Sequence, residues 1–319
     1  MFNREGMTMK TWNFKTLGAA GVAALAMSMV AGTASAMVAG GGPEYPLGAS
    51  LGLPAGAMPP EGFYVNLHPN GSQTNTVNNH GDRTGAGATV FGDFGVFTYV
   101  PGIKILGADY SMAVRGPGIL SIELHAPPYK SVGITKNGVR ATGTGMVDWT
   151  IAPLTLSWAL GNGWFFSGEL AVDVPTGPYD ANNLINTGKN VWTFTPSIAL
   201  TYLKDGYDLT AHLITETPTQ NSSLGYTTGS LGLLDLTATK KFGKWTTGPV
   251  GIYWGQWSPD SGPAALRAPY PVEIALGWDL GYDLAPGIAL NGWLLRDVYA
   301  RNVGSLAVRW QVNLLFKAF

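Results

Sequence analysis

The stretch that decides the fold runs from Trp164 to Tyr202 and reads WFFSGELAVDV-PTGPYDANNLINTGKNV-WTFTPSIALTY. Apolar residues recur at every second position in 164–174 and again in 192–202. A period of two is typical of a β-strand that has one apolar and one polar face. The residues between the two runs are mostly polar or turn-forming, so the stretch predicts two strands joined by a long loop.

The two faces of these strands carry a further pattern. Aromatic residues end the apolar faces, at Trp164, Trp192 and Tyr202. Two carboxylates, Glu169 and Asp173, lie in the middle of the polar face. Aromatic ends, an apolar band and a polar inner face are required of a strand that crosses a membrane in a β-barrel. For this stretch taken alone, the alternative is an exposed sheet of a soluble sandwich.

The composition favours the barrel. Hydrophobic residues make up 45% of the 319 residues, but charged residues only 12%, which is about half the usual share. The abundant glycines and aromatics suit strands that face lipid, and the aromatics exclude a disordered chain. The absence of cysteine excludes disulfide frameworks, thiolate metal sites and cysteine nucleophiles. The balance of 19 basic and 20 acidic residues gives no sign of nucleic-acid binding.

Residues 1–36 have the three parts of a secretory signal peptide. A basic region precedes an apolar core at 17–30, and Ala34-Ser35-Ala36 is a small-residue cleavage site. The mature chain is therefore expected to begin near Met37. No later run reaches about 18 uninterrupted apolar residues, so no transmembrane helix is expected after cleavage. An exported chain of this kind is either a soluble protein or an outer-membrane barrel.

The rest of the chain divides into two parts. Residues 37–61 are rich in Gly, Pro and Ala without periodicity, which predicts an irregular periplasmic or plug segment. Residues 62–319 predict an all-β, antiparallel, up-and-down transmembrane barrel of about twelve strands. A change of parity at Ala152-Pro153 predicts a bulge, because proline cannot donate to the ladder.

The connections between these strands alternate in length. The long ones are expected near 66–85, 126–141, 175–190, 216–226 and 257–270, with a shorter one near 297–303. The short ones are expected near 100–102, 160–163, 203–206, 240–246 and 284–287. Outer-membrane barrels have short periplasmic turns and longer outer loops, so this alternation favours a barrel over a Greek-key sandwich.

Seven short motifs follow one another along the chain: PEGFY (60–64), KILGADY (104–110), GMVDW (145–149) with AP (152–153), VPTGPYD (174–180), GKNVWTF (188–194), YTTG (226–229) and GIYWGQ (251–256). In this order they resemble the outer-membrane, transporter-like proteins of meta-pathway phenol degradation. The resemblance implies a barrel that takes part in the passage of aromatic or other hydrophobic compounds. It implies no catalytic residues.

The polar faces of the expected strands gather ionisable side chains. In a barrel these are expected to line the lumen, where charge and hydrogen bonding set selectivity. The alternative is that they pair with one another and fill a polar interior. The acidic excess favours a lumen that admits cations or neutral solutes. The residues are Asp148, Glu169, Asp173, Asp208, His212, Asp235, Glu273, Asp279, Asp283 and Arg309.

Catalysis is the weaker hypothesis. Outer-membrane hydrolases need a serine held against a histidine, and only His212 lies in mid-strand on an inner face, without a serine motif beside it. His68 and His80 do not have a recognised metal-ligand spacing, and no phosphate-binding glycine loop is present. We therefore expect no catalytic, cofactor or metal site.

These patterns lead to one functional prediction. The protein is expected to be a porin-like channel or transporter in the outer membrane of a Gram-negative bacterium, for passive uptake of small hydrophobic compounds. Its expected partners are outer-membrane lipid, the solute and the barrel assembly machinery. Apolar loop residues such as Leu184-Ile185 either take up solute at the mouth or pack against the rim. A structural barrel without transport and an outer-membrane hydrolase are the alternatives.

Overall fold

The computed structural model describes residues 42–78, 80–126, 139–262, 270–302 and 307–319. The predicted signal peptide, residues 1–36, lies outside the described residues. Among the described residues, no helix is long and apolar enough to cross a membrane.

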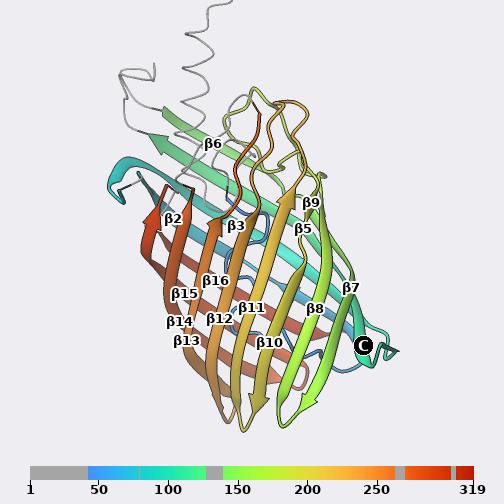
Figure 1. The fold of residues 1–319 in the computed structure, drawn as a ribbon. Helices are drawn as coiled ribbons and strands as arrows, with labels where there is room; N and C mark the ends of the chain where they lie inside the picture. The colour runs from blue at the N-terminus through green and yellow to red at the C-terminus, as the bar shows by residue number, and fades with distance from the viewer. Residues whose placement is uncertain (1–41, 79, 127–138, 263–269, 303–306) are drawn as a thin grey trace, which may run out of the picture.

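The described residues form one closed antiparallel sheet with twelve wall strands (Figure 1). Three wall strands are interrupted and therefore carry two labels each. The short β4 (Lys104–Ile105) is one arm of a turn and pairs with β5. In chain order the wall strands are β1 (Gly62–Leu67) with β2 (Asn70–Val77), β3 (Arg83–Val100), β5 (Ala108–Ala126), β6 (Val139–Met146) with β7 (Trp149–Gly161), β8 (Trp164–Val174), β9 (Thr193–Phe194) with β10 (Ser197–Lys204), β11 (Tyr207–Pro218), β12 (Leu231–Phe242), β13 (Trp245–Gln256), β14 (Val272–Ala285), β15 (Ile288–Arg301) and β16 (Val308–Lys317).

The ring closes where the last strand meets the first. β16 pairs with β15 on one side and with both β1 and β2 on the other, so the sheet has no open edge at this seam. Phe63 and Ala318 extend the pairing beyond β16, and the Phe63 and Phe319 rings stack with centroids 5.4 Å apart. The up-and-down barrel predicted from the connection lengths is confirmed.

The outer surface is apolar and the interior is polar. On β14, Trp278 is 58% exposed on the outer face, whereas the adjacent Asp279 is 0% exposed on the inner face. The same alternation runs through 191–201, where odd residues are buried and even residues exposed. A soluble sandwich would bury its apolar faces, so that alternative is wrong, and the exposed apolar belt together with the closed ring places the chain in the outer membrane.

The bulge expected at Ala152-Pro153 is confirmed. The register between β7 and β8 shifts between Ile151 and Leu154, which absorbs the residue without an N–H. On the other side of β7, the register with β5 shifts between Ser111 and Ala113.

The loop expected over 66–85 is wrong, because it contains β2. Ser72, Thr74 and Thr76 are buried on the inner face, while Gln73 faces outward. Alternation is therefore present, but both faces carry polar or small residues, so hydropathy shows no period. The connection between β2 and β3 is much shorter, and Asn78 organises it by accepting hydrogen bonds from the N–H groups of His80 and Asp82.

The turn expected over 240–246 is also shorter than predicted. β12 continues to Phe242 and β13 begins at Trp245, so Gly243-Lys244 alone makes the turn. Gly243 has a φ of +61°, which favours glycine at this position.

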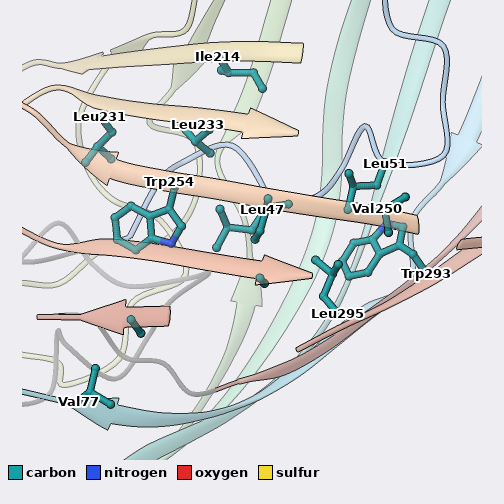
Figure 2. Packing of buried hydrophobic residues seen from close by; sticks show 13 residues of the cluster. Leu47, Leu51, Val77, Ile214, Leu231, Leu233, Val250, Trp254, Trp293 and Leu295 are labelled. Atoms are coloured by element: carbon teal, nitrogen blue, oxygen red, sulfur yellow. The ribbon is translucent and has the colours of Figure 1, made fainter. Parts of the chain in front are cut away.

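Residues 42–61, here called the inner segment, lie inside the barrel. Leu47 and Leu51 of this segment pack against an apolar patch on the inner face of β11–β15, which includes Leu233, Trp254 and Trp293 (Figure 2). Without this cover, the patch would face water in the lumen. Burial of the apolar patch by the leucines therefore holds the inner segment against one side of the wall.

A new charge is expected to reduce stability by different amounts at exposed apolar positions and at exposed polar positions. Leu276→Arg puts a cation in the exposed apolar belt of β14 and is expected to destabilise the barrel by up to about 2–4 kcal/mol. The control Gln73→Arg changes an exposed polar residue of β2 and is expected to be close to neutral. Unfolding by urea from phospholipid liposomes measures both. Equal costs at the two positions would contradict the membrane belt.

Candidate functional site

The inner segment crosses the lumen from the loop end of the barrel to the short-turn end. Glu44 and Tyr45 bind Glu216, which lies near the loop end of β11. Ser50 binds Asp235, and Gly52 binds Thr237, farther along β12. Near its other end, the Gly56 N–H donates to Thr201, and the carbonyls of Ala55 and Gly56 accept from Ser167 and Ser157. The segment then leads into β1 at the short-turn end.

The loop-side end of the inner segment is held from two sides. The Glu216 carboxylate accepts the N–H groups of Glu44 and Tyr45, at 2.8 and 2.6 Å. Lys189 Nζ donates to the Gly42 carbonyl at 2.9 Å and lies 3.5 Å from the Glu44 carboxylate. Both members of this ion pair have side chains less than a tenth exposed. These contacts fix residues 42–45 between β11 and the loop 175–192.

Asp148 places Lys189 inside the barrel. Its carboxylate lies in the break between β6 and β7 and accepts the N–H groups of Gly177 and Lys189, each at 2.7 Å. Gly188 presses against Gly177, so that a Cβ there would lie 2.5 Å from the Gly177 carbonyl group. Asn221 also donates to the Lys189 carbonyl. The two ends of the loop 175–192 are thus drawn together on one carboxylate, and Lys189 is turned toward the inner segment.

His212 meets a serine that the sequence did not pair with it. Its Nδ1 lies 2.9 Å from Ser50 Oγ, and the Ser50 hydroxyl donates to Asp235 at 2.7 Å. In a catalytic triad the carboxylate orients the histidine, and the histidine takes the serine proton. Here the serine hydroxyl is directed at the carboxylate instead, and Tyr45 packs edge-on against the imidazole. The arrangement ties the inner segment to the wall and does not activate a nucleophile.

The other interior charges form compact pairs. Arg115 Nη2 donates to both oxygens of Glu169, at 2.5 and 2.7 Å. Arg309 binds Glu273 and Asp297, and all three side chains are almost fully buried. Buried charges of this kind persist only when paired and hydrogen-bonded.

A cavity of about 100 Å³ remains between the inner segment and the wall. Its charged lining consists of three cations and four carboxylates: Arg115, Lys189, Arg309, Glu44, Asp93, Asp148 and Asp173. Asp173 accepts from the hydroxyls of Thr150 and Thr195. The rest of the lining combines apolar and aromatic residues with glycines and neutral polar residues. The apolar and aromatic residues are Tyr45, Pro46, Leu47, Phe94, Ile119, Leu120, Val147, Trp293 and Trp310, and the neutral polar residues are Asn70, Ser72, Thr150, Thr187 and Gln311. This cavity is the candidate functional site.

The residues singled out in the sequence fall in several places. Asp148, Asp173 and Arg309 line the cavity, and Glu169 and Glu273 lie behind it, paired with its arginines. His212 and Asp235 bind the inner segment. Asp208 accepts from Thr210 and Asp279 from Asn291, away from the cavity. Asp283 pairs with Lys241 at the short-turn rim, where both side chains are more than a third exposed.

Sequence reasoning missed several residues at the site. Glu216 was assigned to a loop, although it continues the inward positions Asp208, Thr210 and His212 of β11. Arg115 continues the inward positions Ser111 and Ala113 of β5, but the buried positions change from odd to even at Gly116-Pro117, which hid its inward position. The histidines of the excluded metal hypothesis lie in different settings: His68 stacks on Phe94 inside the barrel, whereas His80 is exposed in the β2–β3 connection.

A closed ring of strands with an apolar outside, a polar inside and loops of unequal length defines an outer-membrane β-barrel. The model of the family described as "Putative MetA-pathway of phenol degradation" matches residues 69–311. This match covers more than half of the chain, so the protein belongs to that family. The family resemblance read from the motifs is therefore confirmed.

One solved structure has the same fold, and two others show a weaker likeness. An outer membrane channel from Pseudomonas putida F1 superposes with a TM-score of 0.64 at 12% identity, over 82% of this chain and 97% of that chain. The translocator domain of the autotransporter NalP from Neisseria meningitidis gives 0.45 at 10% identity, over 82% and 90%. The KdgM porin gives 0.38 at 7% identity, over 80% and 99%. No curated protein matches the sequence.

The Ser50–His212–Asp235 contacts predict a stability effect without a catalytic one. Ser50→Ala removes the hydroxyl that bridges two buried polar side chains and is expected to destabilise the folded barrel by about 1–3 kcal/mol. Ester hydrolysis by the purified protein is expected to equal that of buffer, before and after the substitution. A hydrolytic rate that falls with Ser50→Ala would contradict the structural assignment.

The Asp148 contacts predict a change in loop exposure. Asp148→Asn removes the charge that holds two N–H groups, so the loop 175–192 is expected to open more often. Tryptic cleavage after the buried Lys189 is expected to accelerate about ten-fold in isolated outer membranes. Asp283→Asn, at the other end of the barrel, is the matched control. Equal cleavage rates in wild type and Asp148→Asn would show that Asp148 does not hold the loop.

Proposed function

We propose that this protein is a passive outer-membrane channel for small, uncharged, hydrophobic compounds, including single-ring aromatics. The observation that carries the proposal is the cavity beside the inner segment, whose cations are each paired with a carboxylate and whose uncharged lining includes many aromatic and aliphatic side chains. The solute moves down its own gradient.

The paired charges favour an uncharged permeant. The cavity is lined by three cations and four carboxylates, and Arg115, Lys189 and Arg309 are each held by a carboxylate partner. An ion entering this space would have to lose its water and compete with these pairs, which costs several kcal/mol in a buried site. A neutral solute meets no such cost. The acidic excess in the sequence alone left cations as an equal candidate.

The size and apolar lining favour a small hydrophobic molecule. A dry cavity of about 150 Å³ is enough to bind benzene, and this cavity of about 100 Å³ has about two thirds of that volume. Trp293 and Phe94 line it from the wall, and Tyr45 and Leu47 line it from the inner segment. A single ring then requires only small side-chain displacements, whereas larger solutes require the inner segment itself to move.

The inner segment acts as a partial plug in this proposal. It fills the side of the lumen formed by β11–β15, where Leu47 and Leu51 cover the apolar patch. The passage is the space left on the opposite side, beside β3, β5 and β7. Outer-membrane lipid around the apolar belt and the barrel assembly machinery are the remaining partners that we propose.

Two comparisons support transport over a purely structural barrel. The solved outer membrane channel from Pseudomonas putida F1 has the same fold, and its description names a channel. The family description refers to phenol degradation, which is chemistry on a small hydroxylated ring. Both concern other proteins and supply the choice of solutes for the test.

Uptake by reconstituted protein tests the proposal. Liposomes with lipopolysaccharide in the outer leaflet, which slows unaided entry of hydrophobic solutes, are expected to take up toluene and phenol faster with the protein than without it. Glucose and benzoate, which are a polar and a charged solute of similar size, are expected to enter at a lower rate. Equal uptake of toluene by empty and protein-containing liposomes would overturn transport and favour the structural barrel.

A further inference from the structure

We propose that Glu216 and Lys189 form a clamp on residues 42–45 that sets the largest solute able to pass. The inference rests on the proposed function in that it assumes a passage beside the inner segment. It does not depend on which solute uses that passage.

Glu216 holds the backbone and not a side chain. Its carboxylate accepts two successive N–H groups, those of Glu44 and Tyr45, while its own side chain is only 2% exposed. Hydrogen bonds to a charged acceptor are about twice as strong as neutral ones. Because two neighbouring donors share one carboxylate, both the position and the direction of the chain are fixed at this point.

Lys189 holds the same residues from the loop 175–192, which leads into β9, the neighbour of β11 beside Glu216. Its ammonium group donates to the Gly42 carbonyl and pairs with Glu44, and its own N–H is fixed by Asp148. The clamp therefore spans from β11, across the inner segment, to the loop 175–192 and the break between β6 and β7. Both clamp residues act on four consecutive residues, 42–45.

The clamped residues border the cavity. Glu44, Tyr45 and Leu47 all belong to its lining, so displacement of residues 42–45 changes the width of the passage. The rest of the inner segment has separate anchors, at Ser50, Gly52 and Gly56. Release of the clamp is thus expected to free the loop-side end of the segment while the remainder stays in place.

Single-channel recordings with neutral polyethylene glycols of graded size test the clamp. Glu216→Gln keeps the shape of the side chain but removes its charge, and Lys189→Met removes the ammonium group. Each variant is expected to give a severalfold higher conductance than wild type and to admit larger polymers. The matched controls Asp283→Asn and Lys241→Met break an ion pair at the short-turn rim and are expected to leave the polymer cut-off unchanged.

Folding is checked separately by the faster migration of an unboiled barrel on a gel. If folded Glu216→Gln and Lys189→Met both keep the wild-type conductance and cut-off, the clamp is wrong. Toluene uptake by the wild type is a different measurement, so a clamp that fails leaves the proposed function standing. If the protein does not accelerate toluene uptake, the polymer cut-off still tests the clamp.

A disulfide distinguishes local release from loss of the whole segment. A Cβ at Gly56 would lie 3.0 Å from the Thr201 Cβ, which is about 0.5 Å below the usual disulfide range, so the bridge requires the inner segment to move outward slightly, and the natural chain has no cysteine to compete. Glu216→Gln in the oxidised Gly56→Cys, Thr201→Cys background is expected to keep its higher conductance. If oxidation restores the wild-type value and reduction reverses it, the entire segment moves and the clamp proposal is overturned.

Discussion

The pairing of β16 with β1 and β2 is the interaction on which the rest of the structure depends. In a bilayer, every backbone N–H and C=O must be hydrogen-bonded within the protein, and a β-sheet meets this requirement only when it closes. Closure also separates a lumen from the outer, lipid-facing surface. Once the wall is complete, each inward side chain faces a confined space, and the polar residues of alternate positions must find partners there or hold water.

The interior meets that requirement with short-range pairs supplied by different strands. Arg309 on β16 is held by β14 and β15 through Glu273 and Asp297, and Arg115 on β5 is held by β8 through Glu169. The inner segment supplies the partners that the wall lacks, since Glu216, Asp235 and Thr237 all accept from it. One irregular stretch therefore serves both as apolar cover for β11–β15 and as a set of donors for buried acceptors.

Much of the wall was predictable because the alternation of apolar and polar residues is a local property of each strand. In 272–284 apolar side chains meet lipid and polar ones meet the lumen, so alternation appears directly in the sequence. β2 was not predicted because both of its faces carry polar or small residues, so hydropathy does not alternate along it. The site was less accessible. Asp148, Asp173 and Arg309 stand out on alternating strands, whereas Glu44 and Ser50 lie in a segment without a period. Their partners are more than 150 residues away in the chain, and no local pattern encodes such contacts.

The position of the inner segment has a consequence for the order of assembly. It is continuous with β1, and β1 is the strand that receives β16 at closure. A finished ring could admit this segment only by drawing Glu44 and the loop-side contacts lengthwise through a narrow, charge-paired interior. We therefore expect the sheet to curl around a segment that already lies on its concave face. The inner segment is thus expected to be in place before the ring closes, and the pairing of β16 with β1 and β2 then encloses it.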